Sequence, residues 1–224
     1  MNVHPPLLTP AYKSTILRAP AQAPILLPHS MTELTGPVLG EGRVSKEDAD
    51  LTMWDGGEAQ GQRIVVHGQV RDSDGRAVPH TLIEVWQANA GGRYRHKWDR
   101  HDAPLDPHFA GAGRVLTDSA GRYRLVTIRP GAYPWGNHEN AWRPAHIHLS
   151  LFGHAFTQRL VTQMYFPDDP LFAYDPIFNS VPSEAGRRAL IADFDLSATV
   201  ESWALGFRFD IVLRGRDATP MEVS

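Results

Sequence analysis

From residue 63 onward, the sequence is divided into seven short runs of β-branched and aromatic residues, each bounded by turn residues. The runs lie at 63–70, 81–88, 113–118, 122–128, 146–152, 159–166 and 205–213. Runs of this length and composition are typical of β-strands. Several such strands separated by turns indicate a sandwich of antiparallel sheets. We therefore predict an all-β chain with a single antiparallel β-sandwich domain and long loops.

Turn and helix signals support this prediction. The sequences DSDGR at 72–76 and DSAGR at 118–122 each place a glycine where a tight hairpin needs positive φ. A helix is indicated only at about 183–192, where Ser183 can cap the first turn and Glu184 lies within it. We therefore expect one short helix, at one end of the sandwich.

The first sixty residues have a different texture. They are rich in proline and glycine and follow no sustained period, as in HPPLLTP at 4–10 and APAQAP at 19–24. Such composition favours extended chain over regular structure. We predict that residues 1–60 form an extended N-terminal arm and linker, and that residues 61–224 form the β-sandwich domain.

Charge and composition exclude several classes of function. Lys and Arg number 22 against 25 Asp and Glu, a net charge of −3, which argues against nucleic acid or a polybasic membrane surface. The sequence contains no run of 18 apolar residues and no signal-peptide pattern at its start, so we expect a cytoplasmic protein. With 0 cysteines, disulfides, thiolate metal ligands and a cysteine nucleophile are all ruled out.

The strongest chemical signal is the sequence HIHLSL at 146–151. Side chains of a strand alternate between its two faces, which places His146, His148 and Ser150 on one face and Ile147 and Leu149 on the other. Two imidazoles held at this spacing can bind one metal ion. The alternative is a polar cross-strand pair without a metal.

Two tyrosines in glycine-bearing loops are further candidate ligands. Tyr94 follows Gly91 and Gly92, and Tyr133 follows Gly131. A phenol is a good ligand only to a hard, strongly Lewis-acidic cation, and Fe(III) meets that demand best. Each tyrosine could instead pack its ring and cap the backbone, and the residues alone do not exclude zinc.

Four motifs in order carry a family resemblance. They are NAGGRYRH at 89–96, APLDP at 103–107, YPW at 133–135 and WRPAHIH at 142–148. With these motifs the chain resembles the intradiol ring-cleavage dioxygenases, and among them the iron-binding β chains of enzymes that act on protocatechuate. The resemblance extends from about residue 8 to residue 215.

The resemblance implies a metal, a reaction and a partner. It implies one non-haem Fe(III) per chain, held by Tyr94, Tyr133, His146 and His148, with Tyr133 also taking up a proton when substrate binds. The implied reaction is cleavage of protocatechuate (3,4-dihydroxybenzoate) with O2 to 3-carboxy-cis,cis-muconate, within the β-ketoadipate pathway of aromatic catabolism. A homologous α subunit would complete an α/β protomer of a larger oligomer, and residues 61–224 would be the catalytic domain.

Five further residues receive roles at the substrate from the resemblance. Arg143 would lie beside the ring and stabilise developing negative charge, with Trp135 and Gln163 near the ring and the O2 site. Tyr12 of the arm would hydrogen-bond the substrate carboxylate, and Ile177 would form a pocket wall. Without the resemblance, Arg143 could equally make a surface salt bridge, and the others are ordinary packing residues.

Two features leave alternatives open. The alternation along 82–87 favours core packing for Trp86, although the resemblance places it next to the ligands. Gly136 follows Trp135 where the family pattern leads us to expect a basic residue, which leaves another catechol open as substrate. A third reading is a metal-free β-sandwich subunit for binding or assembly, as the family's α chains are.

Overall fold

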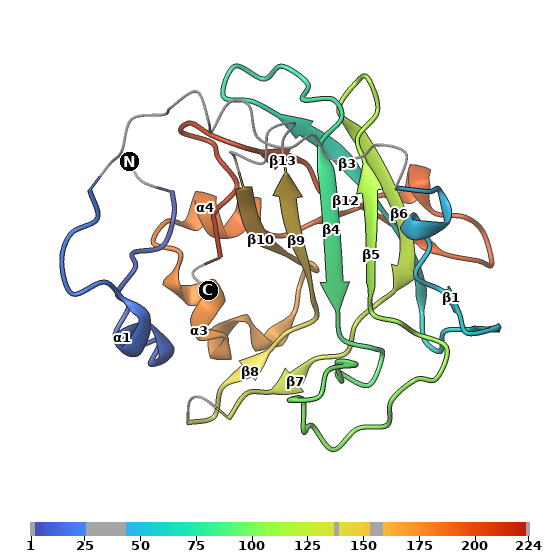
Figure 1. Ribbon diagram of the computed structural model, residues 1–224, viewed down its shortest axis with the longest axis horizontal. Coiled ribbons are helices and arrows are strands. Elements are labelled where there is room, and N and C mark those ends of the chain that lie inside the picture. Colours follow the sequence, from blue (N-terminus) through green and yellow to red (C-terminus); the bar gives the residue numbers. More distant parts are fainter. Residues whose placement is uncertain (1–2, 26–43, 137–138, 153–158, 223–224) are drawn as a thin grey trace.

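The computed structural model describes residues 3–25, 44–136, 139–152 and 159–222, and β-strands make up most of its regular structure (Figure 1). The strands are β1 (Met53–Trp54), β2 (Gly57–Glu58), β3 (Arg63–Arg71), β4 (Leu82–Gln87), β5 (Ala112–Leu116), β6 (Arg122–Ile128), β7 (Tyr133–Pro134), β8 (Trp142–Arg143), β9 (His146–Phe152), β10 (Arg159–Tyr165), β11 (Asp193–Phe194), β12 (Leu205–Arg208) and β13 (Ile211–Val212). The helices are α1 (Ser14–Arg18), α3 (Pro176–Ser180) and α4 (Glu184–Ala189), with 3₁₀ turns η2 (Glu47–Ala49), η3 (Pro170–Tyr174) and η4 (Leu196–Ala198). Each of the seven predicted runs contains at least one strand.

Two sheets form the predicted β-sandwich, which confirms the fold class. One sheet has the strand order β10-β9-β4-β5, and all its neighbours are antiparallel. The other is centred on β3, which pairs antiparallel with β6 and also contacts β12 and β13. A short ribbon of β7 and β8 lies outside both sheets.

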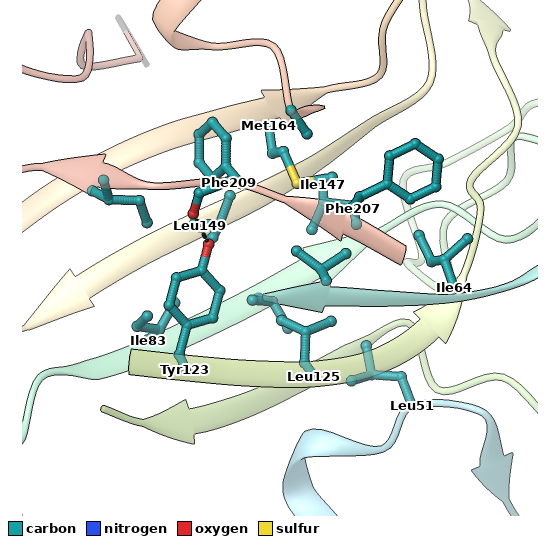
Figure 2. Close-up of a cluster of buried hydrophobic side chains, with 14 of the residues drawn as sticks. Leu51, Ile64, Ile83, Tyr123, Leu125, Ile147, Leu149, Met164, Phe207 and Phe209 are labelled. Atoms are coloured by element: carbon teal, nitrogen blue, oxygen red, sulfur yellow. Dashed lines mark hydrogen bonds between the residues drawn. The ribbon is translucent and has the colours of Figure 1, made fainter. Parts of the chain in front are cut away.

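The core lies between the two sheets and contains apolar side chains of β3, β4, β6, β9, β10, β12 and β13. Figure 2 shows Ile64 of β3, Leu125 of β6 and Phe207 of β12 together with Ile147 and Leu149 of β9. All five are at most 4% exposed. The predicted alternation along β9 is therefore confirmed on its apolar side, and its histidines face away from the core.

The second sheet differs from the antiparallel prediction in one respect. Both β12 and β13 pair parallel with successive parts of β3. The predicted single run 205–213 is divided at Asp210, because the Asp210 carboxylate accepts a hydrogen bond from the Gln69 amide at 2.9 Å in place of a backbone carbonyl. Gly68 faces this break, where a Cβ would lie 1.9 Å from the Phe209 carbonyl oxygen.

The predicted helix is α4, whose N-cap Ser183 accepts a hydrogen bond from the Gly186 amide at 3.0 Å. It ends at Ala189, earlier than expected. The structure adds α1 and α3 to the single helix we predicted. Both have five residues, which is too short for an apolar period to show in the sequence. For α3, the Asp175-Pro176 pair supplies an N-cap and a favourable first residue.

The N-terminal segment is only partly described, because residues 26–43 of the predicted arm lie outside the described residues. Leu51 is 3% exposed and belongs to the core of the sandwich, with Ala49 and Ala59 packed against it. Every helix within the described ranges is too short or too polar to cross a membrane.

Candidate metal centre and active site

Strand β9 presents two histidines on the face of the sheet that points away from the core. In the sheet, His148 lies between Trp86 of β4 and Gln163 of β10, and His146 lies beside Tyr165 of β10. His146 is 2% and His148 is 9% exposed. The pairing on both sides fixes the strand, so both imidazoles point into one covered space.

Two glycines bring the tyrosine loops together. The φ of Gly92 is +79°, and a Cβ there would lie 2.4 Å from the Ala132 carbonyl oxygen. A Cβ on Gly131 would lie 2.4 Å from the Ala90 carbonyl oxygen, and the Gly131 amide donates to the Asn89 carbonyl at 2.9 Å. Only residues without a side chain allow this backbone approach. The ring centroids of the two tyrosines that follow, Tyr94 and Tyr133, are 5.7 Å apart.

The two phenols and two imidazoles converge. The Tyr94 hydroxyl lies 3.3 Å from His146 Nε2 and 3.2 Å from His148 Nε2. The Tyr133 hydroxyl lies 3.4 Å from His146 Nε2. The structure thus brings together all four side chains predicted as metal ligands, which come from three separate stretches of the chain.

This donor set fits a single metal ion. Donors that each lie about 2 Å from one ion, at right angles or wider, are separated by about 3 Å or slightly more. The measured separations of 3.2 to 3.4 Å agree with this spacing. Among the residues described, no three His, Asp or Glu side chains form a metal-binding group, so a metal ion held by His146 and His148 would also need the phenols as ligands. Two phenols with two imidazoles suit a hard, oxidised cation such as Fe(III).

Burial sets the protonation of these groups. It raises the pKa of the Tyr94 phenol well above its ordinary value, with Tyr133 nearby adding to the effect. Burial also raises the pKa of Tyr133, against the opposing effect of Arg143. The pKa of His146 is lowered well below its ordinary value, first by burial and then by Arg143 and His148. The imidazole of His146 is therefore neutral and free to bind a metal, and the phenols ionise only beside a cation.

The hydrogen bonds of the histidines direct their ligating nitrogens. Nδ1 of His146 lies 2.7 Å from the Pro144 carbonyl oxygen. A carbonyl only accepts, so Nδ1 carries the proton and Nε2 presents its lone pair toward Tyr94 and Tyr133. Nδ1 of His148 lies 3.1 Å from a carboxylate oxygen of Glu222. Both rings are therefore oriented with Nε2 toward the phenols.

Arg143 belongs to a buried polar network beside the tyrosines. It lies opposite Tyr133 in the β7–β8 ribbon and is 4% exposed. Its Nε donates to Asp175 at 3.2 Å, and its terminal nitrogen donates to the Gln163 side chain. Tyr165 donates to Asp175 at 3.0 Å. Burial opposes the charged form, but Asp175 and the neighbouring tyrosines hold the pKa of Arg143 above its ordinary value, so it stays a cation.

The remaining predicted residues surround this network. The Trp135 ring lies 5.8 Å from the Arg143 guanidinium and makes an edge contact with Tyr12 at 5.5 Å between centroids. Tyr12 is 3% exposed, so this part of the arm is packed onto the domain. Ile177, in the first turn of α3, lines a small cavity together with Gln163.

Sequence reasoning missed or misplaced four residues of the site. The prediction that Trp86 packs in the core is wrong. Its ring stacks on that of His148, with ring centroids 4.8 Å apart and an interplanar angle of 6°. Tyr165 could have been found, because it lies two positions after Gln163 and therefore on the same face of β10, the face shared with the histidines. For Asp175 the sequence contains only the pattern of a helix N-cap. For Glu222 it contains no pattern, because Glu222 and His148 are 74 positions apart.

Comparison with known proteins identifies the family. A family model described as "Dioxygenase" matches residues 34–215, and one described as "Protocatechuate 3,4-dioxygenase beta subunit N terminal" matches residues 2–30. The chain belongs to the intradiol ring-cleavage dioxygenases, a family of ring-cleaving enzymes that use non-haem iron.

Within this family the chain is most informatively compared with two-chain enzymes. It is 59% identical to the protocatechuate 3,4-dioxygenase beta chain of Burkholderia cepacia, over 98% of this chain and 94% of that one. It is 30% identical to the protocatechuate 3,4-dioxygenase alpha chain of Pseudomonas putida, over 87% and 96% of the two chains. A solved catechol 1,2-dioxygenase from Acinetobacter sp. ADP1 is 26% identical with a TM-score of 0.55, covering 76% of this chain and 59% of that one.

Proposed function

We propose that this chain is the catalytic β subunit of a dioxygenase that opens the ring of protocatechuate between its two hydroxyls. Both atoms of O2 would enter the product, 3-carboxy-cis,cis-muconate. The observation that carries the proposal is the convergence of two phenols and two imidazoles, with three phenol-to-imidazole separations of 3.2 to 3.4 Å. The relative with 59% identity, named for this substrate, supports the choice of catechol.

In this proposal Tyr94, Tyr133, His146 and His148 hold one Fe(III) per chain. When bound, ferric iron supplies the Lewis acidity that draws both catechol oxygens into the site as anions and makes the ring electron-rich. Tyr133 takes up the proton of an incoming catechol hydroxyl, because burial raises the pKa of its phenol and so favours the neutral form. Tyr94, His146 and His148 would hold the metal throughout.

Five residues would act on the substrate itself. Arg143 is a fixed cation, held by Asp175 at 3.2 Å, and would stabilise negative charge as it develops on the ring and its oxygens. Trp135 and Gln163, which both contact Arg143, would form the walls around the ring and the O2 site. Tyr12 makes an edge contact with Trp135 and would hydrogen-bond the substrate carboxylate, with Ile177 as a further wall.

We also propose that this chain pairs with a homologous α subunit and that the two form an α/β protomer within a larger oligomer. This proposal is supported by the match of residues 2–30 to a model specific to β subunits and by the similarity to two α chains. We further propose that residues 61–224 form the catalytic domain and residues 1–60 the arm that supplies Tyr12. A cytoplasmic location stays a prediction from the sequence.

The test uses the chain co-expressed with its α partner. We expect a coloured protein with a visible tyrosinate-to-iron absorption band, consumption of one O2 per protocatechuate, and a product carrying two ¹⁸O atoms from ¹⁸O2. Tyr94→Phe and Tyr133→Phe should each shift or weaken the band, because each removes one phenolate. A colourless wild type, or an unchanged spectrum in both variants, would reject the assignment of the metal site.

One observation keeps a different catechol under consideration. Gly136 follows Trp135, and a Cβ at this position would meet nothing within 4 Å. This position therefore supplies no basic side chain that could meet a substrate carboxylate. Comparing kcat/KM for protocatechuate with that for unsubstituted and other substituted catechols decides between the two, and a preference of tenfold or more for another catechol would replace the proposed substrate.

A further inference from the structure

The two histidines of the site are oriented by different kinds of acceptor. His146 Nδ1 faces a neutral acceptor on its own strand, the Pro144 carbonyl, at 2.7 Å. His148 Nδ1 faces the Glu222 carboxylate at 3.1 Å, and both side chains are 11% exposed. A carboxylate behind an imidazole fixes its tautomer and increases the basicity of the opposite nitrogen. That opposite nitrogen, Nε2, lies 3.2 Å from the Tyr94 hydroxyl.

Glu222 is held in place by the backbone around it. The Thr162 hydroxyl donates to the Pro220 carbonyl at 2.8 Å, and the Glu222 amide donates to the Val161 carbonyl at 2.7 Å. Residues 219–222, here called the C-terminal segment, therefore run along β10, the neighbour of the strand that carries His148. In Figure 1 the last described part of the chain, in red, lies in the same region as α3 and β10.

The C-terminal segment also contacts the start of the chain. The Met221 amide donates to His4 Nδ1 at 3.0 Å, across 217 positions. Pro5 lines a small cavity together with Pro220, Met221 and Glu222. The first residues of the N-terminal arm therefore contact the C-terminal segment, and the carboxylate of Glu222 is directed toward His148.

The His148 ring is constrained on a second side. Trp86 stacks on it with ring centroids 4.8 Å apart, nearly parallel at 6°. Stacking opposes tilting of the ring but permits rotation within its plane. The hydrogen bond to Glu222 opposes that rotation. The two contacts together determine where Nε2 points.

We propose that Glu222 is a positioning residue of the metal centre, and that it acts through His148 by fixing the proton on Nδ1 and directing Nε2 at the metal. This inference rests on the proposed function, because it assumes that the four side chains hold ferric iron. It makes the C-terminal segment a part of the metal centre, although none of its residues is a ligand. It also distinguishes the two histidines, since only His148 has an anionic partner.

The first experiment compares iron retention in the co-expressed complex. The variants are Glu222→Ala, which removes the acceptor, Glu222→Gln, which keeps an uncharged one, and Glu201→Gln, a control at an exposed glutamate. Loss of such a partner lowers metal affinity roughly 10- to 100-fold. We expect Glu222→Ala to release iron to a chelator faster by a factor in that range, Glu222→Gln by less, and Glu201→Gln at the wild-type rate. A shift of the visible absorption band should follow the same order.

The second experiment needs no metal. In the metal-free complex, ¹⁵N NMR of the histidines should show the His148 proton on Nδ1 in the wild type and a mixture of tautomers in Glu222→Ala. Partial rescue by Glu222→Gln would show that the acceptor matters, because a general loss of folding would not be repaired by the amide. Equal iron release and an unchanged His148 tautomer in Glu222→Ala would overturn the inference. A wild type that binds no iron while the tautomer still depends on Glu222 would instead overturn the proposed function.

Discussion

At the scale of single residues, Asp175 holds the most consequential charge of the site. It is completely buried, and its carboxylate accepts hydrogen bonds from Arg143 at 3.2 Å, Tyr165 at 3.0 Å and the Ile177 amide at 2.9 Å. One side chain therefore orients the guanidinium proposed to face the ring and also caps the helix that carries Ile177. A buried ion pair that loses one partner leaves the other charge uncompensated.

We expect Asp175→Asn to lower the free energy of unfolding by about 3 to 5 kcal/mol, measured by denaturant titration. Asp193→Asn is the matched control, because Asp193 pairs with Arg188 but its side chain is 48% exposed. Its effect should be about 1 kcal/mol or less. Equal effects of the two substitutions would show that the Asp175 network contributes no more than a surface pair.

A second residue, Tyr123, makes the free energy of unfolding depend on pH in the alkaline range. It lies in the core, donates to the Phe209 carbonyl, and burial raises its phenol pKa well above the ordinary value. Above pH of about 10 the unfolded chain loses this proton and the folded chain keeps it, so the free energy of unfolding falls as pH rises. Tyr123→Phe should reduce this fall, by a slope that approaches about 1.4 kcal/mol per pH unit at the upper end of the range. Denaturant titrations between pH 9.5 and 11 measure it, and identical slopes would contradict it.

At the scale of elements, two glycine-containing loops set the distance between the tyrosine ligands. We expect Gly92→Ala to abolish iron binding, because its Cβ would lie 2.4 Å from the Ala132 carbonyl oxygen and would push the loop of Tyr94 away from that of Tyr133. Iron content and the visible absorption band report the effect.

Gly75→Ala is the control for this substitution. Gly75 has φ +78°, nearly the same as the +79° of Gly92, but a Cβ there meets nothing within 4 Å. Both variants carry the same backbone strain, about 1 to 2 kcal/mol. Only Gly92→Ala should lose iron, so loss of iron in both would mean that general destabilisation is responsible.

The same elements show what the sequence could and could not predict. The period of two along 146–151 predicted both the core face and the histidine face of β9, because alternation is a local property. The pairing of β12 with β3 was not predicted as parallel, since it joins Leu205 to Ile64 and no local pattern reports so distant a register. The ligand set required the family motifs, because an isolated loop tyrosine such as Tyr94 has no pattern that distinguishes a ligand from a packing residue.

The residues around the metal ligands were harder to predict from the sequence than the ligands themselves. Trp86 alternates with the core residue Val85, but it pairs with His148 on the neighbouring strand and so lies on the face of the histidines. Glu222 follows a stretch without regular structure, so only the three-dimensional path of the chain brings it to the site. Residues that act through a distant partner are the part of a site that local patterns do not contain.

At the scale of the whole molecule, the arm presents apolar side chains to solvent. In α1, Ile16 is 59% and Leu17 is 91% exposed. We expect Leu17→Asp to weaken association with the α chain, because a charge would replace apolar surface in the segment that matches the β-subunit model. Co-purification of a tagged α chain, followed by gel filtration, measures this.

Leu196→Asp is the control for the arm, because Leu196 in η4 is 76% exposed and lies outside the segment that matches the β-subunit model. It should leave the yield of complex unchanged. If both variants associate like the wild type, the exposed apolar residues of α1 do not contribute to the interface.

The parallel pairing of β12 and β13 with β3 has a consequence for synthesis. Residues 205–212 leave the ribosome long after residues 63–71, the central strand of the sheet that they complete. Until then one edge of β3 has unpaired backbone groups, and contacts of such wide sequence separation form slowly. The nascent chain therefore passes through a long interval in which an open strand edge invites aggregation, and chaperones or early capture by the partner subunit would shorten it.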